Sequence, residues 1–115
     1  MKIAIKAIIV CEDNVKSQTN LLNKLMPFIV KNCRCKSSNK YNLWKIALIL
    51  SSTIFAKFSI EKSIAEEIIG KFLKNARNFA ENGGFEKAPS EAVILLAVYL
   101  VNQEHKLSEK LDEYL

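Results

Sequence analysis

The segment NLWKIALILSSTIFAKF, residues 42–58, decides the fold. Asn42 is a natural N-cap, and the apolar residues after it surround most of a helical circumference. A helix that is apolar on nearly all sides is usually buried, so this segment predicts the central helix of the protein. Its apolar residues are Leu43, Trp44, Ile46, Ala47, Leu50, Ile54, Phe55 and Phe58.

Upstream, residues 17–32 carry one apolar helical stripe, with Ser17 or Thr19 as the cap and Pro27 expected to kink or divide the helix. The stripe consists of Leu21, Leu22, Leu25, Phe28 and Ile29. The first ten residues are ambiguous, because isoleucines alternate there as in a strand while nothing else in the chain resembles one. We favour a helix or an extended arm for residues 1–14, unless two chains pair there.

Downstream, Ser63-Ile64-Ala65-Glu66 has the pattern of a capping box and predicts the start of a further helix. Its stripe is Ile64, Ile68, Ile69, Phe72, Leu73, Ala76 and Phe79. Gly83-Gly84 is expected to end it, because glycine adopts the left-handed conformation of a helix C-terminus. Pro89 suits a first helical position, so a helix is predicted over residues 90–105 and a last short helix from Ser108.

Composition agrees with helices throughout. The 115 residues are 50% hydrophobic and include three glycines and two prolines, fewer turn residues than strand-rich folds need. The sequence therefore predicts a single all-α domain over residues 1–115, a compact bundle of about five helices.

The charge is divided unevenly along the chain. Residues 1–62 hold eleven basic and three acidic side chains, whereas residues 63–115 hold six basic and nine acidic ones. A basic half suggests an acidic partner, which is nucleic acid or an acidic protein surface. The alternative is a merely solvated face, since lysine outnumbers arginine fifteen to two. The candidate contact residues are Lys31, Arg34, Lys36, Lys40 and Lys45.

Catalytic and metal-binding patterns are weak. The three cysteines, Cys11, Cys33 and Cys35, form an odd set that is typical of a reducing cytoplasm, and C-x-C is a poor zinc motif. The lone His105 has no nucleophile beside it in sequence. We therefore expect no enzymatic activity, metal or cofactor. Tyr41 and Trp44 lie beside lysines and could stack on bases, but core packing of Trp44 is the favoured interpretation.

From residue 43 onward the order of features resembles a cyclin-box repeat of the archaeal transcription factor B and eukaryotic transcription factor IIB type. The resemblance is carried by residues 60–67, by the loop 83–89, and by the apolar segment 92–100 with its tyrosine, Tyr99. It implies a cyclin-like second half and a helical adaptor that docks on protein or nucleic acid. The chain lacks the paired C-x-x-C zinc ribbon and a second repeat, so we transfer no DNA-contacting residue.

These observations predict a non-enzymatic binding protein, a small transcription-associated regulator that binds nucleic acid or an acidic protein surface through its basic half. The alternative is a self-associating interaction module with no role in nucleic-acid binding. It would form a homodimer through the apolar arm, residues 1–10, and the C-terminal Leu111, Tyr114 and Leu115.

Overall fold

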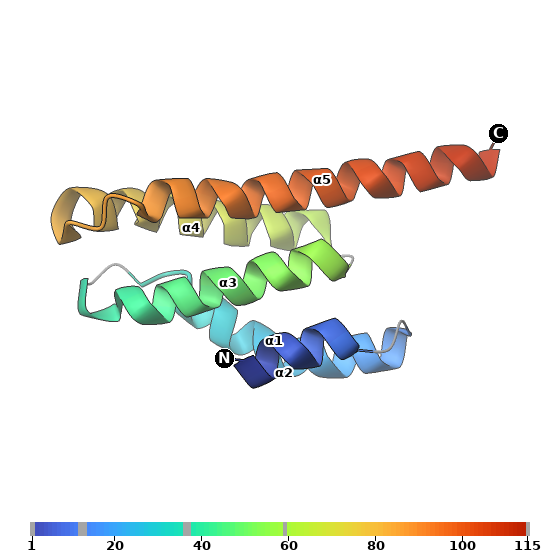
Figure 1. Ribbon diagram of the computed structural model, residues 1–115, viewed down its shortest axis with the longest axis horizontal. Helices are drawn as coiled ribbons and strands as arrows, with labels where there is room; N and C mark the ends of the chain where they lie inside the picture. The colour runs from blue at the N-terminus through green and yellow to red at the C-terminus, as the bar shows by residue number, and fades with distance from the viewer. Residues whose placement is uncertain (1, 12–13, 36–37, 59, 115) are drawn as a thin grey trace.

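The computed structural model describes the backbone of residues 2–11, 14–35, 38–58 and 60–114, and side chains in these ranges except at residues 2, 3, 15, 38 and 105–114. This part of the chain forms helices and no strand, which confirms the all-α prediction. The helices are α1 (Lys2–Val10), α2 (Val15–Asn32), α3 (Tyr41–Lys57), α4 (Lys62–Gly83) and α5 (Ala88–Tyr114), with a 3-10 turn at Ser38–Lys40. Figure 1 shows α4 and α5 on one side of α3, and α1 and α2 on the other.

The central position predicted for α3 is confirmed, because this helix packs against α1, α2 and α5. Helix α3 also contains three hydroxyl residues, Ser51, Ser52 and Thr53, and each hydroxyl donates to the carbonyl four residues earlier in the helix. The hydroxyl of Ser51, which is fully buried, donates to the carbonyl of Ala47 at 2.8 Å, and this bond makes its burial tolerable. The capping role predicted for Asn42 is wrong. The 3-10 turn leads directly into α3, which begins at Tyr41 with no side-chain cap.

Two helices precede α3. Residues 2–10 form α1, and Ile8 is fully buried in the core, which resolves the ambiguity of this segment. The caps predicted for α2 are wrong, because Asn14 accepts the bond from the backbone N–H of Ser17 at 2.8 Å and the helix starts earlier. Pro27 lies inside α2 without dividing it.

The stripe predicted for α4 is largely buried, but its start differs from the prediction. The capping box is not formed: the helix begins at Lys62, and the hydroxyl of Ser63 bonds to the Glu61 carboxylate at 2.9 Å instead. Ile64 is 43% exposed, and Ala65 points into the core in its place. The end is as predicted, because Gly84 adopts a φ of 75° and its N–H donates to the carbonyl of Phe79.

The last two predicted helices are one. Helix α5 runs unbroken for 27 residues, since no glycine or proline interrupts it after Pro89. Its C-terminal part extends beyond the other helices in Figure 1. Within the described residues, no helix has the combination of length and apolar character that crossing a bilayer requires.

Candidate nucleic-acid interface

A buried hydrogen bond joins the end of α2 to the middle of α4. The side-chain amide of Asn75 donates to the backbone carbonyl of Cys33 at 2.7 Å, and both residues are almost fully buried. A buried amide without a partner would be costly, so this bond stabilises the contact between the end of α2 and α4. The residue after Cys33 is Arg34, which is exposed and is thereby held beside the polar face of α4.

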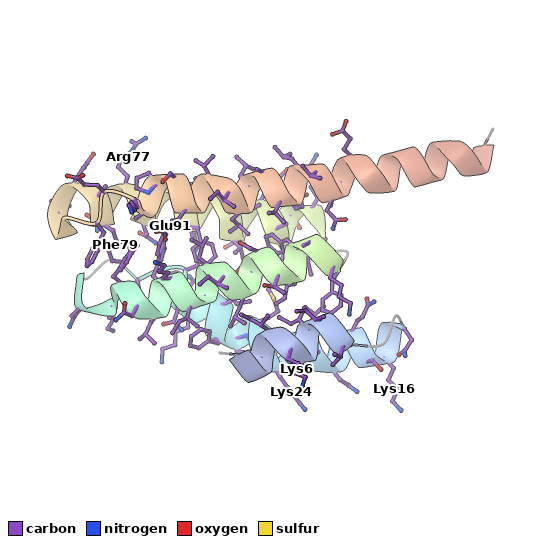
Figure 2. All side chains as sticks on the ribbon, in the orientation of Figure 1. Lys6, Lys16, Lys24, Arg77, Phe79 and Glu91 are labelled. Carbon is purple, nitrogen blue, oxygen red and sulfur yellow. The ribbon has the colours of Figure 1, made fainter. Side chains whose placement is uncertain are left out.

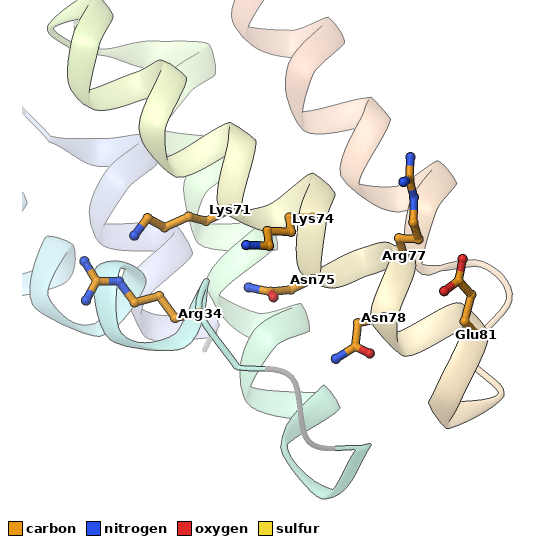
Figure 3. A pocket seen from close by; sticks show the side chains of 7 residues that line it. All are labelled: Arg34, Lys71, Lys74, Asn75, Arg77, Asn78 and Glu81. Atoms are coloured by element: carbon orange, nitrogen blue, oxygen red, sulfur yellow. The ribbon is translucent and has the colours of Figure 1, made fainter.

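A surface hollow with a volume of about 450 Å³ lies at this junction. Its lining consists of Arg34, Lys71, Lys74, Asn75, Arg77, Asn78 and Glu81. Figure 3 shows the side chains of Arg34, Lys71 and Lys74 directed to the same side, while Arg77 extends away from them. Residues three or four apart share one face of a helix, so positions 71, 74 and 78 of α4 present their side chains together.

The charges of Arg34, Lys71 and Lys74 are only weakly compensated. One of them, Lys71, lies 3.6 Å from the carboxylate of Glu67, and that carboxylate is 65% exposed. Exposed ion pairs one helical turn apart contribute little and are readily exchanged for another anion. The single carboxylate among the lining residues, Glu81, lies toward Arg77 rather than toward the other three cations in Figure 3. Such a cluster attracts an anion with several acceptor oxygens.

A second hollow, of about 540 Å³, adjoins the first through Arg34. It is lined by Phe28, Lys31, Asn32, Arg34, Cys35, Lys40 and Leu43. We call the cations of the two hollows the basic surface; they are Lys31, Arg34, Lys40, Lys71, Lys74 and Arg77. They come from the end of α2, from the 3-10 turn and from α4.

The structure brings three of the five sequence-predicted contact residues together, namely Lys31, Arg34 and Lys40. Lys45 lines neither hollow and lies 3.7 Å from the carboxylate of Glu91 on α5. Lys36 is outside the described residues.

Three cations of the basic surface were missed by the sequence analysis: Lys71, Lys74 and Arg77. They belong to a half of the chain whose overall balance is acidic, and averaging the charge over that half hides them. A local count would have found them, because no acidic residue occurs between positions 68 and 80.

The aromatic residues near these lysines are used in core packing. Trp44 has no exposed surface, which confirms the interpretation favoured from the sequence. Tyr41 is stacked on Phe85 with ring centres 3.9 Å apart, and its other neighbours are Trp44 and Phe79. These rings stabilise the contact between α3, α4 and the loop that precedes α5.

Two of the three cysteines, Cys33 and Cys35, directly follow α2. Cys33 is buried, and this burial raises the pKa of its thiol, which makes it a poor nucleophile at neutral pH. The thiol of Cys35 contacts the side-chain oxygen of Asn32 at 3.6 Å. Among the residues with described side chains, no three His, Cys, Asp or Glu are grouped so that they could hold a metal ion. His105 lies outside the described side chains.

Comparison of the chain with protein-family models, curated proteins and solved structures gives no significant match. The resemblance to a cyclin-box repeat therefore remains a prediction. The basic surface is the feature of the molecule that points to a function.

Proposed function

We propose that the protein is a non-enzymatic nucleic-acid-binding protein that holds the phosphate backbone on its basic surface. The observation that carries this proposal is that Arg34, from the turn after α2, and Lys71 and Lys74, from α4, line one hollow. Cations that repel one another are stabilised when a polyanion lies between them, and phosphate oxygens accept bonds from both ammonium and guanidinium groups.

The extent of the basic surface favours a polymer over a small anion. Arg34 lines both hollows, so a chain of phosphates can follow the cations from Lys40 past Arg34 to Lys74. Five of the six charges of the basic surface lie on side chains that are exposed, and the sixth, Lys71, is partly exposed. An acidic protein surface would bind to the same cations. If no nucleic acid binds, such a protein surface becomes the expected partner.

Binding of this type depends on the backbone and not on base sequence. Four of the six cations are lysines, which act mainly as point charges, and the neighbouring aromatic rings are packed in the core. The resemblance of residues 43–115 to a cyclin-box repeat supports the role of a small transcription-associated adaptor for such a protein.

The test compares two variants that remove the same number of charges. R34Q/K71Q/K74Q removes the charges of Arg34, Lys71 and Lys74, and K6Q/K16Q/K24Q removes three exposed lysines of α1 and α2. Figure 2 shows Lys6, Lys16 and Lys24 on the edge of the molecule opposite to Arg77. Fluorescence anisotropy of labelled duplex DNA, single-stranded DNA and RNA at several salt concentrations measures affinity and its salt dependence.

We expect micromolar binding by the unaltered protein that weakens steeply with salt. The R34Q/K71Q/K74Q variant should lose at least about tenfold in affinity, and the slope of log K against log salt should shrink by about 0.7–0.9 for each phosphate contact removed. The K6Q/K16Q/K24Q variant should bind nearly as well as the parent. Equal losses in both variants would show unspecific attraction to a positive molecule and would overturn the proposal, as would absence of binding at low salt.

A further inference from the structure

The surface of α5 that points away from the bundle is aliphatic. Val93, Ile94, Leu100 and Val101 are 52%, 59%, 55% and 65% exposed, and the exposed Ala97 lies between them. We call these five residues the α5 outer face. The opposite side of the same helix is in the core, where Ala92, Leu95 and Tyr99 are buried.

A helix with apolar residues on both sides is normally covered on both sides. No charged residue occurs between Glu91 and Glu104, so nothing in this stretch favours contact with water. The outer surface of α4 differs, because Glu66, Lys74 and Arg77 are exposed there. Of the nine large hydrophobic residues that are exposed among the described side chains, four belong to the α5 outer face. The outer face is therefore a distinct feature of α5.

The apolar surface continues from α5 across the end of α3. A hollow of about 450 Å³ is lined by Ala56, Ile94, Ala97, Val98, Val101 and Asn102. Ala56 also lines a neighbouring hollow together with Ile9, which is 63% exposed. Small residues at the centre, Ala56 and Ala97, let another helix approach closely, and larger side chains on either side supply contact area.

We propose that the α5 outer face pairs with the same face of a second copy of the chain, with the two α5 helices antiparallel and crossing at Ala97. The face is its own complement in this arrangement. A two-fold axis at Ala97 sets Val93 opposite Val101 of the other copy, and Ile94 opposite its Leu100. An interface formed by one patch on both subunits is the commonest kind in homodimers.

Charge selects both the occupant and the direction of pairing. The α5 outer face carries no charged side chain. It therefore has no cation to bind nucleic acid and no opposite charge to pair with an acidic or basic protein surface. A parallel pair in register would bring the two Glu104 side-chain positions toward each other, and like charges at an interface are unfavourable. The antiparallel pair sets Glu104 opposite Ser90. This dimer leaves the basic surface uninvolved, since the α5 outer face shares no residue with it.

Analytical ultracentrifugation over a concentration series tests the pairing. The unaltered protein should form a reversible dimer. I94E/L100E should weaken association at least about a hundredfold while circular dichroism stays unchanged, because a carboxylate buried without a partner is strongly unfavourable. V30E/L43E is the matched control, since Val30 and Leu43 are 37% and 42% exposed on other helices and their substitution should leave the dimer intact.

The two-fold geometry is tested by cross-linking with Ala97→Cys. Residues on a two-fold axis meet their own copy, so this variant should form a disulfide-linked dimer on treatment with diamide, whereas Val30→Cys and the parent chain should not. Adding I94E/L100E to Ala97→Cys should abolish the cross-link. A monomer at all accessible concentrations, a dimer insensitive to I94E/L100E, or a dimer that Ala97→Cys fails to cross-link would each overturn the proposal.

Discussion

Lys57 holds α1 onto the bundle, and its removal gives a sharp prediction. Its ammonium group donates to the carbonyls of Ile8, Ile9 and Cys11 at 2.7, 2.7 and 2.8 Å. An ammonium has three hydrogens, so all of them are used. The accepting carbonyls lie at the C-terminal end of α1, where helix carbonyls lack partners and a cation is favoured. Lys57→Met keeps an unbranched side chain and removes the charge and all three bonds.

The expected loss is smaller than three separate bonds would suggest. A hydrogen bond that involves a charged group contributes about 1.5–3 kcal/mol net. Two of the three bonds are exposed, so water replaces much of what the lysine supplied. We therefore expect the free energy of unfolding to fall by about 2 kcal/mol, roughly the contribution of one such bond. For 115 residues the entropy of unfolding is about 0.24 kcal/mol/K, so Tm should fall by about 8 °C.

Thermal unfolding and hydrogen exchange together check this reasoning. Helix α1 has nine residues and is too short to persist without tertiary contacts, so its amides should exchange faster in the variant than those of α3. Lys62→Met is the control, because Lys62 forms only an exposed pair with Glu66 at 3.9 Å. A Lys57→Met variant within about 2 °C of the parent, with unchanged exchange in α1, would refute the role of this lysine.

Two further predictions concern the core. Trp44 is fully buried, and its indole N–H has no acceptor in the described part of the chain. Trp44→Phe removes this unsatisfied donor, so it should lower the free energy of unfolding in urea by about 1 kcal/mol, against about 3–5 kcal/mol for Trp44→Ala. Equal losses in the two variants would contradict this. Burial raises the pKa of the Cys33 thiol above its ordinary 9.0, and burial with the nearby Glu91 carboxylate raises the pKa of Tyr41 above 10.0. As the pH rises, the unfolded chain loses these two protons at a lower pH than the folded chain does. The free energy of unfolding should therefore be highest below pH 9 and decline through pH 9 and 10. In Tyr41→Phe the decline above pH 10 should be shallower. Urea midpoints across this range under reducing conditions measure it, and a midpoint that stays level or rises would count against it.

The fold could be predicted largely from hydrophobic spacing. The burial of most apolar residues of α3 follows from their spread around the helix, and the end of α4 follows from the glycine at position 84. The helix starts were wrong at Ser17, Asn42 and Ser63. A cap requires a particular backbone angle before the helix as well as a suitable side chain, and tertiary contacts set that angle. At residue 41, for example, stacking on Phe85 accompanies an earlier start of α3.

The candidate site was harder to predict because it is assembled from segments that are distant in sequence. Arg34 and Lys74 are forty residues apart, and what brings them together is the bond from Asn75 to the carbonyl of Cys33. No sequence pattern marks a single asparagine as a buried tie between helices, because its spacing in α4 also fits a solvated face. The same limit applied to α5. Val93, Leu100 and Val101 fit one apolar helical stripe in the sequence, as core residues would, yet all three are exposed in the structure. Only the structure shows that the rest of the chain covers one apolar side of α5 and leaves the other, the α5 outer face, exposed. This exposed apolar side is the reason to expect a second copy there.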